Sequence, residues 1–129
     1  MILNTALTCL ALNIYHEARS EPLYSQVAVA QVTLNRVSNP NYPSTVCGVV
    51  TQKGQFSWYW DGLSDKPTEP LAWERSVALA DLILEANISV DCVDNSTHYH
   101  ADYVKPYWSK VFEKTCQLGK HIFYKERKV

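Results

Sequence analysis

The sequence predicts an α+β domain that is mainly helical and carries a small β-sheet. Three long segments place apolar residues at the helical spacing i, i+3, i+4, i+7. Two strand-like segments follow in the second half of the chain, so the helices precede the sheet. At 129 residues the chain is long enough to bury a real core. We therefore expect residues 1–129 to form a single domain.

Composition and charge narrow the classes of function. Hydrophobic residues make up 47% of the chain and charged residues 19%, which is typical of a globular protein. The net charge is −1, so the overall field gives no reason to expect nucleic acid or an anionic membrane as a partner. Residues 1–12 are apolar, but they lack a basic region and a cleavage site and are too short to span a bilayer. We expect a monomer without stable membrane insertion and see no signal peptide.

The first two helices meet at a proline. A stripe of apolar residues every three or four positions predicts a helix over residues 5–20. Pro22 disfavours helical geometry at Glu21 and therefore ends this helix. The same apolar spacing predicts a second helix that continues to Val37, and the Asn-Pro-Asn-Tyr-Pro-Ser run beyond it predicts a loop.

The later elements are a helix and two strands, preceded by two short segments. Residues 45–52 are a short apolar run that fits either a strand or a helix. Residues 55–62 are aromatic and bounded by glycine, which favours a strand or an ordered loop. Periodicity predicts a third helix over residues 69–87. Residues 97–103 and 120–125 favour strands.

Four cysteines occur, and none forms a Cys-x-x-Cys pair, so zinc-ribbon and thioredoxin-like sites are disfavoured. An even count permits two disulfides or four free thiols. We expect Cys9, within the first apolar helix, to be a buried small hydrophobic residue. A single disulfide among Cys47, Cys92 and Cys116 remains open.

Two glutamates four residues apart are the first candidates for chemistry. On a helix, Glu17 and Glu21 would share a face with Cβ atoms roughly 5–6 Å apart, a separation compatible with a two-carboxylate glycosidase. Burial of Glu17 on its apolar helix would raise its pKa and keep it protonated, as a general acid requires. The alternative is an exposed helix end with two solvated carboxylates and Arg19 nearby. Because Pro22 turns the backbone, we expect Glu21 to be structural. It would cap the next helix or pair with Arg19 or Arg36.

The histidines allow a zinc site as an alternative. His98 and His100 share one face of their predicted strand, and His16 or His121 could complete a zinc site. Strand histidines also occur in substrate grooves without metal. No His-Glu-x-x-His motif is present, and adjacent His16 and Glu17 point about 100° apart on a helix. We therefore expect no metal and no cofactor.

Aromatic and amide side chains suited to sugars occur at Gln55-Phe-Ser57-Trp and at residues 103–108, although core packing would use aromatic side chains equally well. A serine nucleophile is disfavoured, because Ser57 lies outside any Gly-x-Ser-x-Gly motif. With four glycines in the chain, no Gly-rich phosphate-binding loop is present.

Several sequence blocks follow one another in a specific order. Tyr-His-Glu-Ala-Arg-Ser-Glu spans residues 15–21, Ser-Gln-Val-Ala-Val-Ala-Gln-Val spans residues 25–32, and Asn-Arg-Val spans residues 35–37. Further blocks lie at residues 42–50, 55–58, 97–100 and 119–124. Together they resemble the bacterial and phage cell wall hydrolases related to spore-cortex lytic enzymes.

The resemblance implies a lysozyme-like, lytic-transglycosylase-like core that acts on peptidoglycan. Glu17 matches the family's single catalytic glutamate, which protonates the oxygen between N-acetylmuramic acid and N-acetylglucosamine. It then acts as base while the muramic 6-hydroxyl closes an anhydro ring. One carboxylate suffices, which favours an orienting role for Glu21, alongside Arg19 and Asn35. The expected substrate-groove residues are Gln55, Ser57, Thr97, His98, Tyr99 and His121.

Three sites depart from the family pattern. Ser20, Ser25 and the Asp94-Asn95 pair stand where the family has glycines, and we expect all of them at turns. Two other functions stay open: a zinc-dependent N-acetylmuramoyl-L-alanine amidase and a non-catalytic wall-binding module. In every case the expected place of action is the bacterial cell wall, in the periplasm or outside the cell. A phage-encoded enzyme released at lysis would fit.

Overall fold

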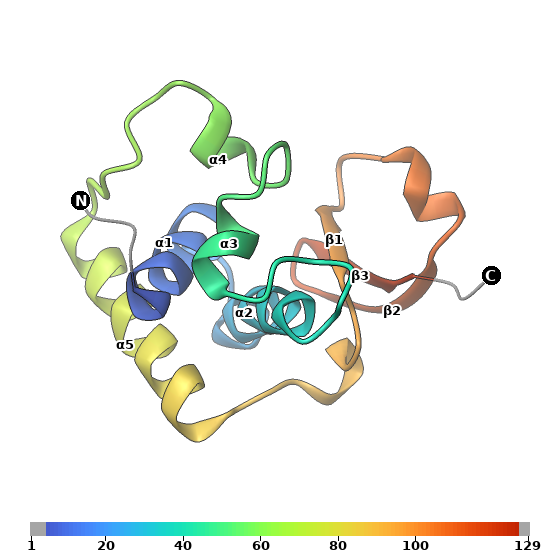
Figure 1. Cartoon of the computed structure of the whole chain (residues 1–129), viewed down its shortest axis with the longest axis horizontal. Helices are drawn as coiled ribbons and strands as arrows, with labels where there is room; N and C mark the ends of the chain where they lie inside the picture. The colour runs from blue at the N-terminus through green and yellow to red at the C-terminus, as the bar shows by residue number, and fades with distance from the viewer. Residues whose placement is uncertain (1–4, 127–129) are drawn as a thin grey trace.

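The computed structural model describes residues 5–126 and confirms the mainly helical α+β prediction (Figure 1). Helices and strands follow the predicted order, with helices first and the sheet last. The α-helices are α1 (Ala6–Ala18), α2 (Leu23–Val37), α3 (Val46–Val50), α4 (Ser57–Trp60) and α5 (Pro70–Ala86). Two 3₁₀ turns, η1 (Asp91–Val93) and η2 (Tyr107–Lys110), accompany the strands β1 (His98–Ala101), β2 (Glu113–Leu118) and β3 (His121–Lys125).

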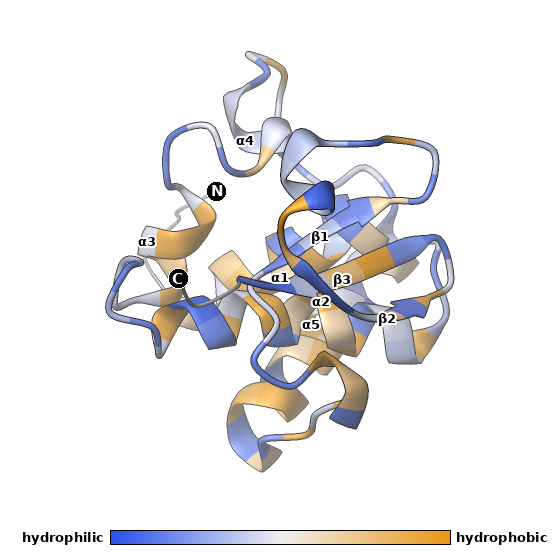
Figure 2. Ribbon diagram, turned by 90° about the vertical axis from the view of Figure 1, so that its right-hand side faces the viewer, coloured by the Kyte–Doolittle hydropathy of each residue, from blue (hydrophilic) through white to orange (hydrophobic). Residues whose placement is uncertain are grey.

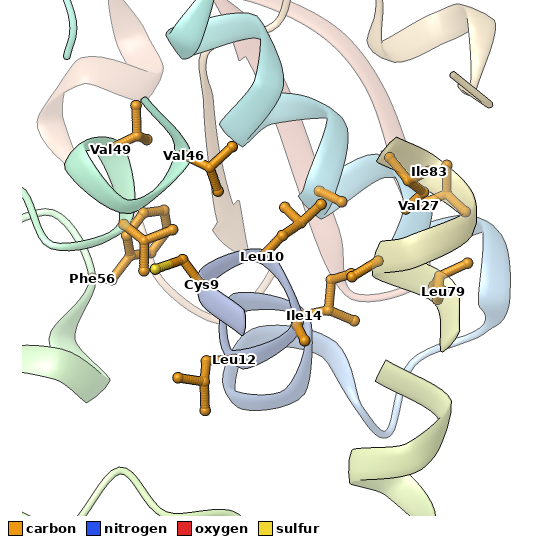
Figure 3. Close-up of a cluster of buried hydrophobic side chains, with 14 of the residues drawn as sticks. Cys9, Leu10, Leu12, Ile14, Val27, Val46, Val49, Phe56, Leu79 and Ile83 are labelled. Atoms are coloured by element: carbon orange, nitrogen blue, oxygen red, sulfur yellow. The ribbon is translucent and has the colours of Figure 1, made fainter. Parts of the chain in front are cut away.

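Helix α1 lies among α2, α3 and α5 and forms the centre of the larger core (Figure 3). Its residues from Cys9 to Tyr15 are all buried, so this helix is enclosed on every side instead of showing one apolar stripe. Thr5 begins the helix, because its side-chain oxygen accepts the Thr8 amide hydrogen at 3.1 Å. A fully enclosed helix is a rigid support for the polar residues at its C-terminal end.

The sheet has the strand order β1-β3-β2, and both strand pairs are antiparallel. A second buried cluster joins its central strand to α2 through Phe123, Val29 and Val32. Figure 2 views the molecule from the sheet side, with α2 behind the strands. Strand β2 was absent from the sequence prediction, because its Glu-Lys-Thr-Cys-Gln-Leu run is largely polar, as an exposed edge strand allows.

Two segments whose structure was mispredicted or left open, residues 55–62 and 45–52, each contain a short helix. Residues 55–62 contain the short helix α4 instead of a strand. Trp58 turns inward from it and stacks on His16 with ring centroids 4.5 Å apart, so core packing decides the backbone here. The ambiguous run at residues 45–52 forms α3, which Thr45 caps by accepting the Gly48 amide hydrogen at 3.0 Å.

The cysteines form two disulfides, Cys9–Cys47 and Cys92–Cys116. Cys9 is buried as predicted, but it is not the free hydrophobic residue that we expected. The packing of α1 against α3 brings its Cα within 5.2 Å of the Cα of Cys47, inside the range that a disulfide spans. Such pairing depends on tertiary contacts and not on spacing in the sequence.

The residues that replace the family's glycines, Ser20, Ser25 and Asn95 among them, lie in different surroundings. Asn95 adopts a left-handed backbone with φ +63°, a conformation that asparagine tolerates better than most residues. Ser20 lies in the turn after α1. Ser25 is wrong as a turn residue, because it is buried within α2. Within residues 5–126, no helix is both long enough and apolar enough to cross a membrane.

Candidate active site

Glu17 lies in the last turn of α1 and faces Tyr99 of β1. The Tyr99 hydroxyl donates a hydrogen bond of 2.5 Å to Oε1 of Glu17. The second carboxyl oxygen, Oε2, has no hydrogen-bond partner among residues 5–126, yet it is not sealed inside the protein. The tyrosine therefore holds one oxygen and leaves the other open for a proton transfer.

The surroundings of Glu17 favour its protonated form. Burial raises its pKa, and this effect outweighs the Tyr99 hydrogen bond and the positive charge of Arg36, which both lower it. The pKa of Tyr99 is also raised, by burial and by the nearby carboxylate, so its hydroxyl stays a donor. A proton-bearing carboxyl group held by a neutral donor is the arrangement that a general acid needs.

Arg36 links two of the predicted groove residues, Thr97 and Gln55. It extends from α2, donating from Nε to the Thr97 carbonyl at 2.7 Å and from Nη1 to Oε1 of Gln55 at 3.0 Å. Thr97 precedes β1, and Gln55 precedes α4. A single guanidinium therefore joins a loop to the strand that carries Tyr99.

A second polar chain runs from Thr97 to the end of β3. The Thr97 hydroxyl donates to Oε1 of Glu126 at 3.2 Å, and the Tyr42 hydroxyl donates to the same oxygen at 2.6 Å. His98 Nδ1 lies 3.0 Å from the Thr97 hydroxyl. Burial is the main cause that lowers the pKa of His98 to about 4, so its imidazole is neutral at neutral pH.

Glu21 leaves the face that it would share with Glu17 on a continued helix. Its Oε1 accepts the Lys120 amide hydrogen at 2.8 Å and lies 3.5 Å from Nδ1 of His121. Burial lowers the pKa of His121, so the imidazole is neutral near pH 7 and this contact is polar but not a full ion pair. Glu21 therefore ties the end of α1 to the β2–β3 turn. The structural role is as predicted, but its side chain does not cap α2, and the pairings with Arg19 or Arg36 are wrong.

Gly119 gives Glu21 the space for this contact. Its φ is +57°, and a Cβ at this position would lie 2.8 Å from Oε1 of Glu21 and 3.0 Å from the Ser25 hydroxyl. Gly119→Ala should cost at least about 1 kcal/mol more in unfolding free energy than Gly62→Ala, because both positions strain the backbone of an alanine but only Gly119 adds a clash. Gly62 is the matched control, because its φ is +78° and no atom lies within 4 Å of the place that a Cβ would take. Urea denaturation of both variants measures the difference, and equal losses would contradict the close contact with Glu21.

The other two orienting candidates, Asn35 and Arg19, differ in their contacts. Asn35 donates from Nδ2 to the Ser96 carbonyl at 2.8 Å and so holds the turn before β1. Arg19 donates to Glu69 at 2.5 Å, with side chains 35% and 56% exposed, so this ion pair adds little stability. Its guanidinium also lies over the ring of Tyr15, 4.4 Å from the centroid.

Two cavities border this region. A cavity of about 310 Å³ lies beside Glu17 and is lined by His16, Glu17, Ala18, Arg19, Ser20 and Glu69. A larger one, of about 740 Å³, is lined by residues that include Asn35, Asn95, Thr97, Lys125 and Glu126. Of the two, only the smaller cavity is lined by Glu17.

Two predicted groove residues, His121 and Ser57, make no hydrogen bond to the Glu17 carboxyl group. His121 is buried, and its ring packs edge-on against the ring of Tyr99 with centroids 5.3 Å apart. It therefore supports the tyrosine that holds Glu17. Ser57 is exposed at the start of α4, and its hydroxyl makes no hydrogen bond to another residue between 5 and 126. The polar residues that the prediction did not include are Arg36, Tyr42 and Glu126. Arg36 stands in the Asn-Arg-Val block, but spacing alone could not identify its partners.

The four histidines have separate partners. His16 Nε2 lies 2.8 Å from the Asp65 carbonyl, and His100 Nε2 lies 2.9 Å from the Tyr124 hydroxyl. His98 and His100 do share one face of β1, where both rings contact Trp108. Across residues 5–126, no group of three or more His, Cys, Asp or Glu side chains is placed to hold a metal ion. The zinc site proposed as an alternative is therefore not assembled from these histidines.

Solved structures and curated proteins include relatives of this chain. The catalytic domain of the germination-specific lytic transglycosylase SleB from Bacillus anthracis superposes with a TM-score of 0.73 at 31% identity, covering 93% of both chains. The catalytic domain of Bacillus cereus SleB gives a TM-score of 0.71 at 31% identity, covering 93% of this chain and 89% of that one. The fold is thus the lysozyme-like, lytic-transglycosylase-like core that the sequence predicted.

Among curated proteins, the spore cortex-lytic enzyme of Bacillus cereus is 34% identical over 116 residues, and that of Bacillus subtilis is 31% identical over 121 residues. The alignments cover 87% and 93% of this chain but 41% and 37% of the two relatives, so the chain spans about two fifths of their length. The Cell Wall Hydrolase family model matches residues 20–124, a span that begins three positions after Glu17. On this match, the chain belongs to the Cell Wall Hydrolase family.

Proposed function

We propose that this chain is a peptidoglycan lytic transglycosylase that cleaves the bond between N-acetylmuramic acid and N-acetylglucosamine, with Glu17 as its acid and base. The observation that carries the proposal is the Glu17 carboxyl group, whose pKa is raised by burial and whose Oε1 accepts a hydrogen bond from Tyr99. The likeness to catalytic domains of a lytic transglycosylase supports the same reaction. We further propose that the chain acts as one catalytic domain.

The reaction needs one group that first donates a proton and then accepts one. Glu17 would transfer its proton from Oε2 to the glycosidic oxygen as the bond to C1 of the muramic ring breaks. The product alcohol leaves with that proton, and Glu17 becomes a carboxylate. It then takes the proton of the muramic 6-hydroxyl while that oxygen bonds to C1. The ring closes as an anhydro sugar, and the carboxyl group is restored.

The surrounding carboxylates fit a mechanism with a single working acid. Glu21, four residues further on, accepts the Lys120 amide hydrogen and lies beside His121. Glu69 lines the same cavity as Glu17 but is paired with Arg19 at 2.5 Å. Both carboxylates are thus engaged with donors of the protein, which supports an internal hydroxyl as the nucleophile instead of a water that a second carboxylate activates.

The place of action follows from the substrate. Peptidoglycan lies outside the cytoplasmic membrane, so we propose that the protein acts in the periplasm or outside the cell. Both disulfides fit an oxidising compartment. Release at lysis of a phage-infected cell is one route to the wall. We also propose that the protein works as a monomer without inserting into the membrane.

The nature of the released sugar tests the proposed reaction. Mass spectrometry of peptidoglycan sacculi digested with the protein should detect anhydro-muropeptides. Hydrated reducing ends would mean a muramidase or a glucosaminidase, and free stem peptides would mean an amidase. Chelation with EDTA should leave the rate unchanged, whereas a zinc amidase would lose its activity. A protein that binds sacculi and releases nothing would be the wall-binding module.

A further inference from the structure

Arg36 is almost completely buried, although arginine is rarely found in a protein interior without an ionic partner. Neither of its hydrogen-bond acceptors is charged, since one is the Thr97 carbonyl and the other is the amide oxygen of Gln55. The rings of Tyr42 and Phe56 lie 5.1 and 5.8 Å from the guanidinium carbon. Burial lowers the pKa of Arg36, and the nearby charges of Glu126 and Glu17 offset this effect only in part. Neither carboxylate accepts a hydrogen bond from the guanidinium, so its two hydrogen bonds to neutral acceptors point to a positioning role.

The guanidinium determines which way the Gln55 amide points. A guanidinium has only donors, so the atom of Gln55 that lies 3.0 Å from Nη1 must be the oxygen. The amide NH₂ group is then directed away from Arg36. Gln55 is an exposed residue, and no acceptor for this NH₂ group is found among residues 5–126. The side chain is thus an oriented donor without a partner in the protein.

The guanidinium of Arg36 also connects the Gln55 amide with Glu17. Its second hydrogen bond holds the carbonyl of Thr97, two residues before Tyr99 in the chain. Tyr99 in turn holds Glu17. Arg36 therefore connects the loop that carries the Gln55 donor with the strand that positions the carboxyl group.

We propose that Arg36 is a positioning residue that locks the Gln55 amide with its NH₂ group outward, as a hydrogen-bond donor to an oxygen of the bound glycan. The inference rests on the proposed function, because it takes the glycan strand as the ligand. Glycan hydroxyls and acetamido carbonyls both supply acceptor oxygens. An amide that is oriented before binding loses less freedom when the glycan arrives, which favours affinity.

Gln55→Glu separates a donor role from a structural one. The carboxylate still accepts a hydrogen bond from Arg36, now with opposite charge, but it has no NH₂ group to donate. Binding is measured by calorimetry with a peptidoglycan-derived glycan oligosaccharide in a Glu17→Gln background, where we expect cleavage to be at least about 100-fold slower and the charge of Glu17 plays no part. We expect at least about a tenfold weaker affinity than for Glu17→Gln alone, because a donor is lost and an acceptor is left facing an acceptor.

Stability and charge controls accompany this measurement. The melting temperature of Gln55→Glu should equal or exceed that of its parent, because Arg36 gains a charged partner. Gln117→Glu makes the same change of charge on strand β2 and should leave the affinity unchanged. Unchanged affinity in the Gln55→Glu variant would overturn the inference, since Gln55 would then serve only as an acceptor for the guanidinium.

A double-mutant cycle tests whether Arg36 acts through Gln55. Arg36→Lys keeps the charge but cannot make two hydrogen bonds in a fixed fork, so the affinity should fall several-fold. In a Gln55→Ala background the same substitution should leave the affinity unchanged, and an equal loss there would overturn the positioning role. Cleavage by Glu17→Gln near the wild-type rate would instead contradict the proposed function while leaving the Gln55 result interpretable. Failure of Glu17→Gln to bind glycan would overturn both.

Discussion

Glu17→Gln should lower the rate of glycan cleavage at least about 100-fold, because glutamine has no proton to transfer to the glycosidic oxygen. The amide oxygen can still accept the Tyr99 hydrogen bond, so the geometry around the site is kept. Release of soluble muropeptides from purified sacculi measures the rate. Glu85→Gln, on the exposed part of α5, is the matched control and should cleave at the wild-type rate. Turnover near the wild-type rate in Glu17→Gln would refute its role as the acid.

The same substitution should raise stability at neutral pH. Burial raises the pKa of Glu17 above its ordinary value of 4.5, so the folded state binds this proton more tightly than the unfolded chain does. Stability is therefore lost as the pH rises from the unfolded pKa through the folded pKa. Glutamine does not ionise and avoids this loss. The melting temperature of Glu17→Gln should exceed that of the wild type at pH 7, and the difference should shrink below pH 4.5.

Removing the Cys9–Cys47 disulfide should cost about 4 kcal/mol of unfolding free energy on the loop-entropy model, given the sequence separation of 38 residues. The double variant Cys9→Ala/Cys47→Ala avoids leaving a free thiol in the core. Guanidinium denaturation of this variant and of the wild type measures the difference. The Cys92–Cys116 bond closes a shorter segment, and its removal should cost slightly less, about 3.5 kcal/mol.

A control for bond formation uses the intact protein. Alkylation of the unfolded wild type without a reductant should modify none of its four cysteines, and alkylation after reduction should modify all of them. A loss below about 1 kcal/mol in the double variant would contradict a stabilising role for the first bond. Reduced wild-type protein should unfold more easily than either double variant, because it loses both bonds.

Local patterns predicted the helices better than the sheet. The apolar spacing around Leu10 and Ile14 identified α1, and Pro22 separated it from α2, because both signals act within a few residues. Strand β2 was missed, since an exposed edge strand needs little apolar alternation. The segment around Trp58 was misjudged, because burial of that ring against His16 outweighs the strand preference of aromatic residues.

The sequence by itself determined that Glu17 stands on an apolar helix, and the ordered motif blocks identified the family. Only the tertiary structure decided what surrounds this carboxyl group. Tyr99 reaches it from 82 positions further along the chain, and Arg36 joins Gln55 to Thr97. The physical reason is the distance along the chain over which each interaction acts. Helical periodicity is a property of neighbouring residues, whereas desolvation and hydrogen bonding at a site depend on distant segments that only packing brings together.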